Sequence, residues 1–284
     1  MRLAEIERHV SSIEELQRIV GAMRAIASMR VQEALRALTS VRQYGSALAV
    51  AVREALAIAA DERIAPRESQ RRGRRAIVVF TSEHGFVGGF NERLIEAAGV
   101  KPETGDTLLI VGSRGAALAS DRGLAVASTH AMATRLASVP EVVQRVQDWL
   151  YPRIACAEIV RAAVVFACHQ RSGATAIERR QLFPLDLSVR RERSGPVPLH
   201  DLPAAELLER LTAEYIISQL TEAATESLAA ENGARFAAME AAHDNVGKKL
   251  QALRLDASRA RQEEVTTELL DLVTGQQAVD GSPS

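Results

Sequence analysis

Two glycine-bearing turns are the parts of the sequence whose residue types fit phosphate chemistry. The segment SEHGFVGGFN (residues 82–91) follows one apolar run, and GSRGAAL (residues 112–118) follows another. Turns between a strand and a helix often bind phosphate through backbone N–H groups. The first turn lacks the GK[ST] ending of a P-loop, and the second has two of the three dinucleotide-fingerprint glycines at a different spacing. Both patterns therefore favour structural turns over nucleotide sites.

The titratable residues form no catalytic or metal-binding pattern. Glu83 and His84 are adjacent, and neighbours in a turn usually point apart. The six histidines are scattered without the spacing of a zinc ligand set, and the sequence has no G-x-S-x-G elbow or H-E-x-x-H helix. Cys156 and Cys168 are too few for a disulfide framework, which makes a reducing compartment the default. We therefore expect no catalytic residue, cofactor or metal.

Residues 74–195 have the pattern of an α/β domain, Rossmann-like, with a largely parallel sheet. Short continuous apolar runs, typical of strands covered on both faces, alternate with helical segments. The expected strands are residues 76–81, 107–112, 124–128, 161–169 and an edge strand that begins near 176 and ends before Pro184. The expected helices are residues 91–99, 115–121 and 140–159, the last with a break at Pro152.

The two ends of the chain predict long helices. Residues 1–65 contain no proline, and residues 204–279 are dominated by residues that favour helices; a polar tail, residues 280–284, follows. About 70 helical residues make a rod roughly 105 Å long, too long for its own chain to bury entirely. The C-terminal helix therefore needs a partner helix or another protein along its length. Its residues Glu222 and Glu226 are interpreted as part of a solvated face.

The partner helix is expected to be the N-terminal one, where apolar residues recur every seven positions. One series is unbroken: Ile6, Ile13, Val20, Ala27, Ala34, Val41 and Leu48. A second row is placed three residues on, at Leu16, Met23, Ala37, Tyr44 and Ala51, with breaks at His9 and Arg30. A sustained seven-residue repeat favours a coiled coil, so we expect the terminal helices to pair antiparallel. Two separate helices on the surface of a globular domain are the alternative.

Composition excludes some classes of function. The formal net charge of −1 provides no general attraction to nucleic acid. No stretch approaches the 18 apolar residues of a membrane-spanning helix, so no direct span is expected. Aromatic residues make up only 4% of the chain, which suits helical rods better than a large packed core.

Three stretches, in order, resemble the γ subunits of F-type ATP synthases. Residues 11–34 (SSIEELQRIVGAMRAIASMRVQEA) resemble the family's S-I-x-x-x-x-K-I-x-x-A-M-x-x-V-A-x-x-K pattern. Residues 81–91 (TSEHGFVGGFN) resemble S-D-R-G-L-C-G-G-x-N and retain Ser82, Gly85, Gly88, Gly89 and Asn91. The last helix matches at Arg235, Met239, Asp244, Asn245, Arg259, Arg261, Gln262, Thr266, Glu268 and Gly275. The resemblance spans nearly the whole chain.

Several departures from the family's pattern suggest a divergent branch, such as an alternative bacterial F-type ATPase. Glu14 and Glu15 replace a basic or amide pair, and Val87 replaces a cysteine. Glu83 and His84 replace Asp-Arg, and Arg-Gln-Tyr at residues 42–44 replaces Arg-Pro-Tyr.

The resemblance implies a non-catalytic rotor of the central stalk, which couples ion flow to ATP synthesis or hydrolysis on β subunits. Its implied partners are the α and β subunits, the ε subunit and a membrane c-ring, on the cytoplasmic face of a bacterial plasma membrane. The residues implied to contact the α/β hexamer are Met23, Arg259, Arg261, Gln262 and Thr266. The residues implied to contact ε or the c-ring are Gly85, Gly88, Gly89 and Asn91.

Two other classes of function stay open at this point. One is a homo-oligomeric coiled-coil scaffold that carries an α/β domain. The other is a nucleotide-dependent enzyme that uses the turn at residues 82–91.

Overall fold

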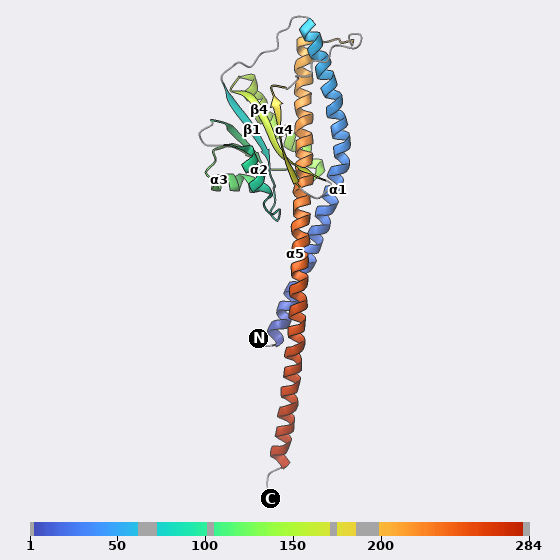
Figure 1. The fold of residues 1–284 in the computed structure, drawn as a ribbon, viewed down its shortest axis with the longest axis vertical. Coiled ribbons are helices and arrows are strands. Elements are labelled where there is room, and N and C mark those ends of the chain that lie inside the picture. The colour runs from blue at the N-terminus through green and yellow to red at the C-terminus, as the bar shows by residue number, and fades with distance from the viewer. Residues whose placement is uncertain (1–2, 62–72, 101–104, 171–174, 186–198, 281–284) are drawn as a thin grey trace. The chain divides into compact units, whose positions relative to one another are not determined.

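The structure, a computed structural model, describes residues 3–61, 73–100, 105–170, 175–185 and 199–280. The chain divides into two compact units, and the long helices α1 and α5 contribute to both. We call Ala27–Arg235 the sheet unit, and Met1–Ile26 with Phe236–Ser284 the helix unit. The elements are α1 (Leu3–Asp61), β1 (Arg74–Phe80), α2 (Phe90–Ala98), β2 (Thr107–Val111), α3 (Ser113–Asp121), β3 (Val126–His130), η2 (Leu136–Ser138), α4 (Val139–Ala155), β4 (Ile159–His169), β5 (Thr175–Phe183) and α5 (Ala204–Asp280), as Figure 1 shows.

The sheet unit is built on one five-stranded sheet with the order β3-β2-β1-β4-β5. Strands β1 to β4 are parallel to one another, and the edge strand β5 is antiparallel to β4. The central strands are nearly continuous apolar runs; β2, for example, is buried at all five positions. Such runs belong to strands covered on both faces, so the predicted α/β domain with a largely parallel sheet is confirmed.

Helices cover both faces of this sheet (Figure 1). One face packs against α2 and α3, through residues such as Leu94 and Ala119, both fully buried. The other face packs against α4 and the first part of α5, through residues such as Val142 and Leu220. The inserted domain is therefore a three-layer structure in which α5 serves as one of the covering helices.

The long helices run antiparallel within each unit. In the helix unit, ion pairs join Arg24 to Glu240 at 3.1 Å, Glu14 to Arg254 at 2.7 Å, and Glu7 to Arg261 at 2.5 Å. In the sheet unit, Arg42 binds Glu226, and the Tyr44 hydroxyl donates to Glu214 at 2.7 Å. Residue numbers fall along α1 as they rise along α5, so the predicted antiparallel pairing is confirmed.

The first of the two predicted heptad rows is confirmed, and the second is wrong at two of its five members. Every member of the first row from Ile6 to Leu48 is buried or half-buried. In the predicted second row, Leu16 and Tyr44 are 43% and 50% exposed. The buried row lies four residues on instead of three, at Val31, Leu38, Gly45, Val52 and Ala59. This row passes through Gln17, Arg24 and Gly45, whose residue types concealed it in the sequence.

Three further expectations about single elements are corrected. Strand β3 begins two residues later than predicted. Helix α4 does not break at Pro152 but continues to Ala155, because Pro152 lies in the last turn and only one hydrogen bond along the helix is lost. Glu222 and Glu226 are not solvated: their side chains are only 14% and 3% exposed, because α1 and β5 cover this face of α5.

The corrected row predicts which leucines of α1 stabilise the fold. Leu38→Ala removes a side chain that is 2% exposed, so we expect a loss of roughly 2–5 kcal/mol in the free energy of unfolding. Leu16→Ala is the matched control, and we expect a change within about 0.5 kcal/mol. Urea unfolding of the full chain measures both. Equal losses for the two variants would contradict the assignment of the second row.

Candidate functional site

The carboxyl end of the sheet is where an α/β domain would bind a ligand. Strand β1 has β2 on one side and β4 on the other, so the strand order reverses at β1, and ligands usually enter the crevice at such a point. The turn at residues 82–91 begins at this position, directly after β1. A ligand site at this point would therefore lie between this turn and the ends of the neighbouring strands.

The turn is closed by hydrogen bonds within itself. The Ser82 backbone N–H donates to Asn91 Oδ1 at 2.9 Å, and Asn91 Nδ2 donates to Ser82 Oγ at 2.8 Å. Asn91 is 7% exposed and serves as an internal brace, whereas Gly88 lies at the surface with a φ of +55°. Two residues before Gly88, Phe86 is 66% exposed at a φ of +62°. The turn thus presents an aromatic side chain and a glycine backbone outward.

The second glycine-bearing turn leads into α3, whose N-terminus already holds an anion from this chain. Glu83 Oε2 accepts the Ser113 backbone N–H at 3.2 Å and the Met132 N–H at 2.8 Å, and Glu83 Oε1 accepts the Ser113 hydroxyl at 2.5 Å. Partial burial raises the pKa of Glu83, but these hydrogen bonds outweigh it and hold the pKa below its usual value. A phosphate would need this same position.

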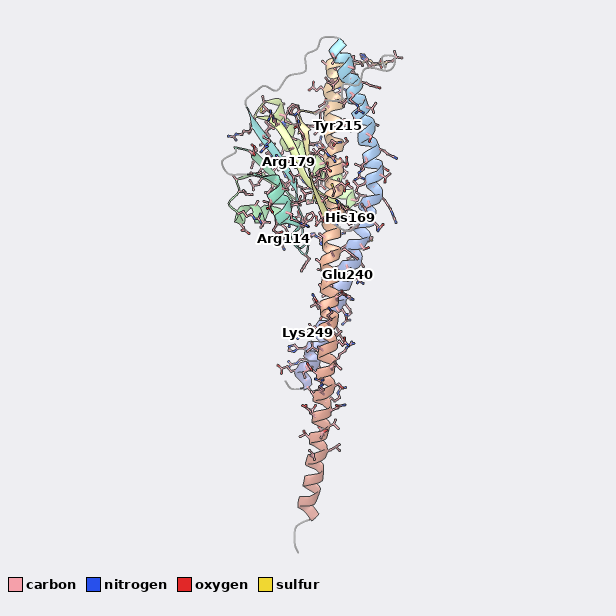
Figure 2. All side chains as sticks on the ribbon, in the orientation of Figure 1. Arg114, His169, Arg179, Tyr215, Glu240 and Lys249 are labelled. Carbon is pink, nitrogen blue, oxygen red and sulfur yellow. The ribbon has the colours of Figure 1, made fainter. Side chains whose placement is uncertain are left out.

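Helix α5 fills the rest of the crevice. Ser227 Oγ donates to the Phe80 carbonyl at 3.3 Å, and Arg235 donates to the carbonyls of His84 and Gly85, both at 3.3 Å. A Cβ on Gly233 would lie 2.6 Å from Nδ1 of His169, the residue at the end of β4 that Figure 2 labels. The helix backbone therefore contacts the ends of β1 and β4 directly, where a ligand would otherwise lie.

A buried ion pair anchors α5 at this position, and sequence reasoning missed it. Arg235 Nη2 donates to Glu231 Oε1 at 2.6 Å, and Arg235 Nη1 donates to Asn232 Oδ1 at 3.2 Å. All three side chains are almost fully buried. The i,i+4 spacing of Glu231 and Arg235 was visible in the sequence, and so was Gly233 between them, but nothing there showed what they would contact.

Two other features are absent from the described ranges, a metal-binding cluster and a membrane-spanning helix. Among those residues, no group of three or more His, Cys, Asp or Glu side chains is arranged to hold a metal ion. None of the helices in the part of the chain that the structure describes has a segment long and apolar enough to cross a membrane.

The last turns of α5 form a second candidate site, in the helix unit. Residues 261–270 are exposed throughout. Arg261 pairs with Glu7 of α1, Arg259 lies 3.9 Å from Asp256, and the Thr266 hydroxyl donates to the Gln262 carbonyl at 2.7 Å. Arg259, Arg261, Gln262 and Thr266 therefore share one exposed stretch of helix.

Exposed apolar side chains accompany these polar ones. On α1 they recur three or four residues apart, at Leu16, Ile19 and Ile26, with the half-buried Met23 between them. On α5 they are Leu255, Val265 and Leu269, which are 56%, 50% and 57% exposed. Exposed apolar side chains at helical spacing, next to polar ones, mark surfaces that bind other proteins.

Comparison with known proteins gives one consistent family. A family model described as "ATP synthase" matches residues 2–279. An "ATP synthase gamma chain" from Thermobifida fusca is 27% identical over 98% of this chain and 96% of its own. One from Frankia casuarinae is 29% identical over 98% of each chain.

The fold has relatives among solved structures of rotary complexes. A chain from the Euglena gracilis mitochondrial ATP synthase, titled "OSCP/F1/c-ring, rotational state 3", matches with a TM-score of 0.59 over 99% of this chain and 97% of its own. A chain from the Tetrahymena thermophila "central stalk/cring" matches with a TM-score of 0.56 over 79% of this chain and 99% of its own. The identities, 14% and 16%, make these likenesses of fold.

The buried Glu231 predicts a measurable pH dependence of stability. Burial raises the pKa of this carboxyl from its ordinary 4.5 to about 7, although Arg235 opposes the rise; the charge of Glu83 adds to it. The folded state therefore holds the proton more tightly than the unfolded state. This contribution to stability is fully present below about pH 4.5 and is lost as the pH rises through 7.

Glu231→Gln cannot ionise, so we expect it to remove that loss. The free energy of unfolding of the Gln variant, minus that of the parent chain, should increase between about pH 4.5 and 7 and then level off. Urea unfolding at a series of pH values measures this difference, in which other titrating groups cancel. A difference that stays constant over this range would contradict the assigned pKa.

Proposed function

Because it belongs to the ATP synthase γ-chain family, we propose that this chain is the rotor that couples ion flow through a membrane c-ring to ATP synthesis or hydrolysis. As a γ chain it is a non-catalytic subunit of the central stalk, and catalysis lies on the β subunits. The observation that carries the proposal is the match to this family along residues 2–279. We further propose that the complex lies on the cytoplasmic face of a bacterial plasma membrane.

The pairing of α1 with α5 suits a shaft that transmits torque. In the helix unit the two helices are joined by ion pairs at three levels, from Arg24–Glu240 to Glu7–Arg261. In the sheet unit the seam between them includes small side chains such as Ala27 and Ala34, which allow close approach. A slender helix pair with cross-connections resists twisting better than one exposed helix.

The exposed stretch of the helix unit is the proposed contact with the α/β hexamer. Arg259 and Arg261 present planar guanidinium groups, which suit carboxylates on a facing loop. Gln262 and Thr266 add polar groups on the same stretch, and Val265 and Leu269 add apolar area. On α1, Met23 lies in the apolar row with Leu16, Ile19 and Ile26, which we assign to the same partners.

The turn at residues 82–91 is the proposed contact with the ε subunit or the c-ring. The exposed Phe86 provides apolar area, and the glycine backbone at Gly88 and Gly89 permits close approach. Gly85 is half-buried and holds Arg235 through its carbonyl. Asn91 is assigned an indirect role, because its side chain braces the turn from inside.

Reconstitution tests the proposed function as a whole. The full chain, coexpressed with the α and β subunits, is expected to co-purify with them as a complex with steady-state ATPase activity. The chain alone should hydrolyse no ATP and bind none stoichiometrically. A stable homo-oligomer that does not join α and β would contradict the proposal and favour the scaffold. Nucleotide binding that Gly88→Ala abolishes would favour the enzyme.

The proposed contact on α5 predicts that its removal lowers ATPase turnover without unfolding the chain. Arg261→Ala with Gln262→Ala should keep the helix intact, because Ala is the best helix former. One charge-assisted hydrogen bond contributes about 1.5–3 kcal/mol, so ATPase turnover of the assembled complex should fall roughly 10- to 150-fold. Turnover at saturating ATP in the purified complexes measures the effect.

Two controls isolate this contact. Glu209→Ala with Arg210→Ala truncates an exposed pair elsewhere on the same helix and should leave turnover unchanged. Glu7→Ala breaks the intrachain pair with Arg261 but leaves Arg261 able to bind a β subunit. If Glu7→Ala lowers turnover as much as the double variant, the effect comes from the α1–α5 pair and the proposed contact is wrong.

A further inference from the structure

We propose that a polar cluster in the sheet unit fixes the axial register of α1 against α5 and joins this helix pair to the edge of the sheet. We call it the register cluster. Its members are Arg42 of α1, Glu178 and Arg180 of β5, and Glu222 and Glu226 of α5.

On its helix side, the register cluster connects one residue of α1 to two of α5. Arg42 Nε lies 3.5 Å from Glu222 Oε1, and Arg42 Nη2 binds Glu226 Oε1. The two carboxylates are one helical turn apart, so a single guanidinium spans both. Arg42 is 57% exposed and reaches inward over the seam, whereas the Glu226 side chain is only 3% exposed. The buried carboxylate therefore depends on Arg42 for its positive partner.

On its sheet side, the register cluster continues through Glu222. Arg180 Nη1 donates to Glu222 Oε2 at 3.1 Å and to Gln219 Oε1 at 2.8 Å. Its Nη2 lies 2.7 Å from Glu178 Oε1, and its guanidinium stacks over the Phe166 ring at 5.0 Å. Glu222 is thus shared between an arginine of α1 and an arginine of β5. One connected set of charges links the helix pair to the sheet.

The apolar seam alone discriminates weakly between registers. Along α1, apolar side chains are buried at Ala27, Val31, Ala34 and Leu38, so similar residues recur seven positions on. A shift by seven residues, about 10 Å, replaces Ala27 by Ala34 and Val31 by Leu38. At these positions of α1, one apolar side chain takes the place of another after such a shift.

The register cluster does discriminate between the observed register and these shifted ones. The same shift places Leu35 or Ala49 where Arg42 stands, and the Glu226 carboxylate then stays buried without its cation. Without Arg42, the buried Glu226 must either stay charged without a cation or take up a proton, and both cost free energy. Single buried polar residues select the register of other helix pairs by this mechanism.

For a shaft under torque, a fixed register prevents the two helices from sliding past each other. That consequence rests on the proposed function. The register itself is a property of the chain alone, so it is tested without α or β subunits.

Disulfide formation between α1 and α5 reports the register. A Cβ on Gly45 would lie 3.6 Å from Ser218 Oγ, so Gly45→Cys with Ser218→Cys reports the observed alignment. Leu38→Cys or Val52→Cys, each with Ser218→Cys, reports a shift of α1 by seven residues in either direction. All three pairs are made in the full chain with Cys156→Ser and Cys168→Ala, and are oxidised under mild conditions.

With the register cluster intact, we expect the cross-link between positions 45 and 218 alone. Arg42→Met with Glu226→Met replaces the ion pair by apolar side chains, and cross-links at 38–218 or 52–218 should then appear at yields comparable with the first. Glu226→Gln keeps the shape of the side chain and should give shifted cross-links at lower yield. Tyr44→Phe, the matched control, removes an exposed α1–α5 hydrogen bond and should give none.

Two results would overturn the proposal. One is the 45–218 cross-link alone in both the Met double variant and the Gln variant, because the apolar seam would then set the register. The other is shifted cross-links in the chain with an intact register cluster. If the Met double variant does not fold, the Gln variant decides between the outcomes.

Discussion

The contact of α5 with the carboxyl end of the sheet is the constraint on which the rest of the sheet unit depends. A helix covers the ends of β1 and β4 there because Gly233 has no side chain and His169 occupies the space that a Cβ would need. Arg235, which is almost fully buried, then donates to the carbonyls of His84 and Gly85. These hydrogen bonds hold the turn at residues 82–91 against α5.

In this α/β domain with the strand order of a nucleotide-binding fold, groups of the chain itself occupy the point where a ligand would be expected. The N-terminus of α3 is satisfied by Glu83, and α5 fills the space beside β1. Both features use groups that bind phosphate in other folds, namely a helix N-terminus and a glycine-bearing turn. Here they serve packing, which is consistent with a non-catalytic subunit of the central stalk.

Charges replace large apolar side chains as the source of specificity between α1 and α5. The small side chains of the seam permit close approach but repeat along the helix. Ion pairs such as Arg24–Glu240 and Arg42–Glu226 do not repeat in the same way, so they distinguish one alignment from its neighbours. Stiffness and alignment thus come from different groups of residues on the same pair of helices.

The sequence by itself determined the elements, the largely parallel sheet, the first heptad row and the family resemblance, because these follow from local periodicity and short motifs. Only the tertiary structure decided that Val31 and Leu38, and not Leu16 and Tyr44, complete the seam. It also decided that Glu226 is buried. Burial depends on which distant segment covers a residue, and that segment cannot be identified from the residue type alone. The sequence around Glu226 does not show whether its side chain lies in water or is covered by Arg42, which is 184 residues away in the chain.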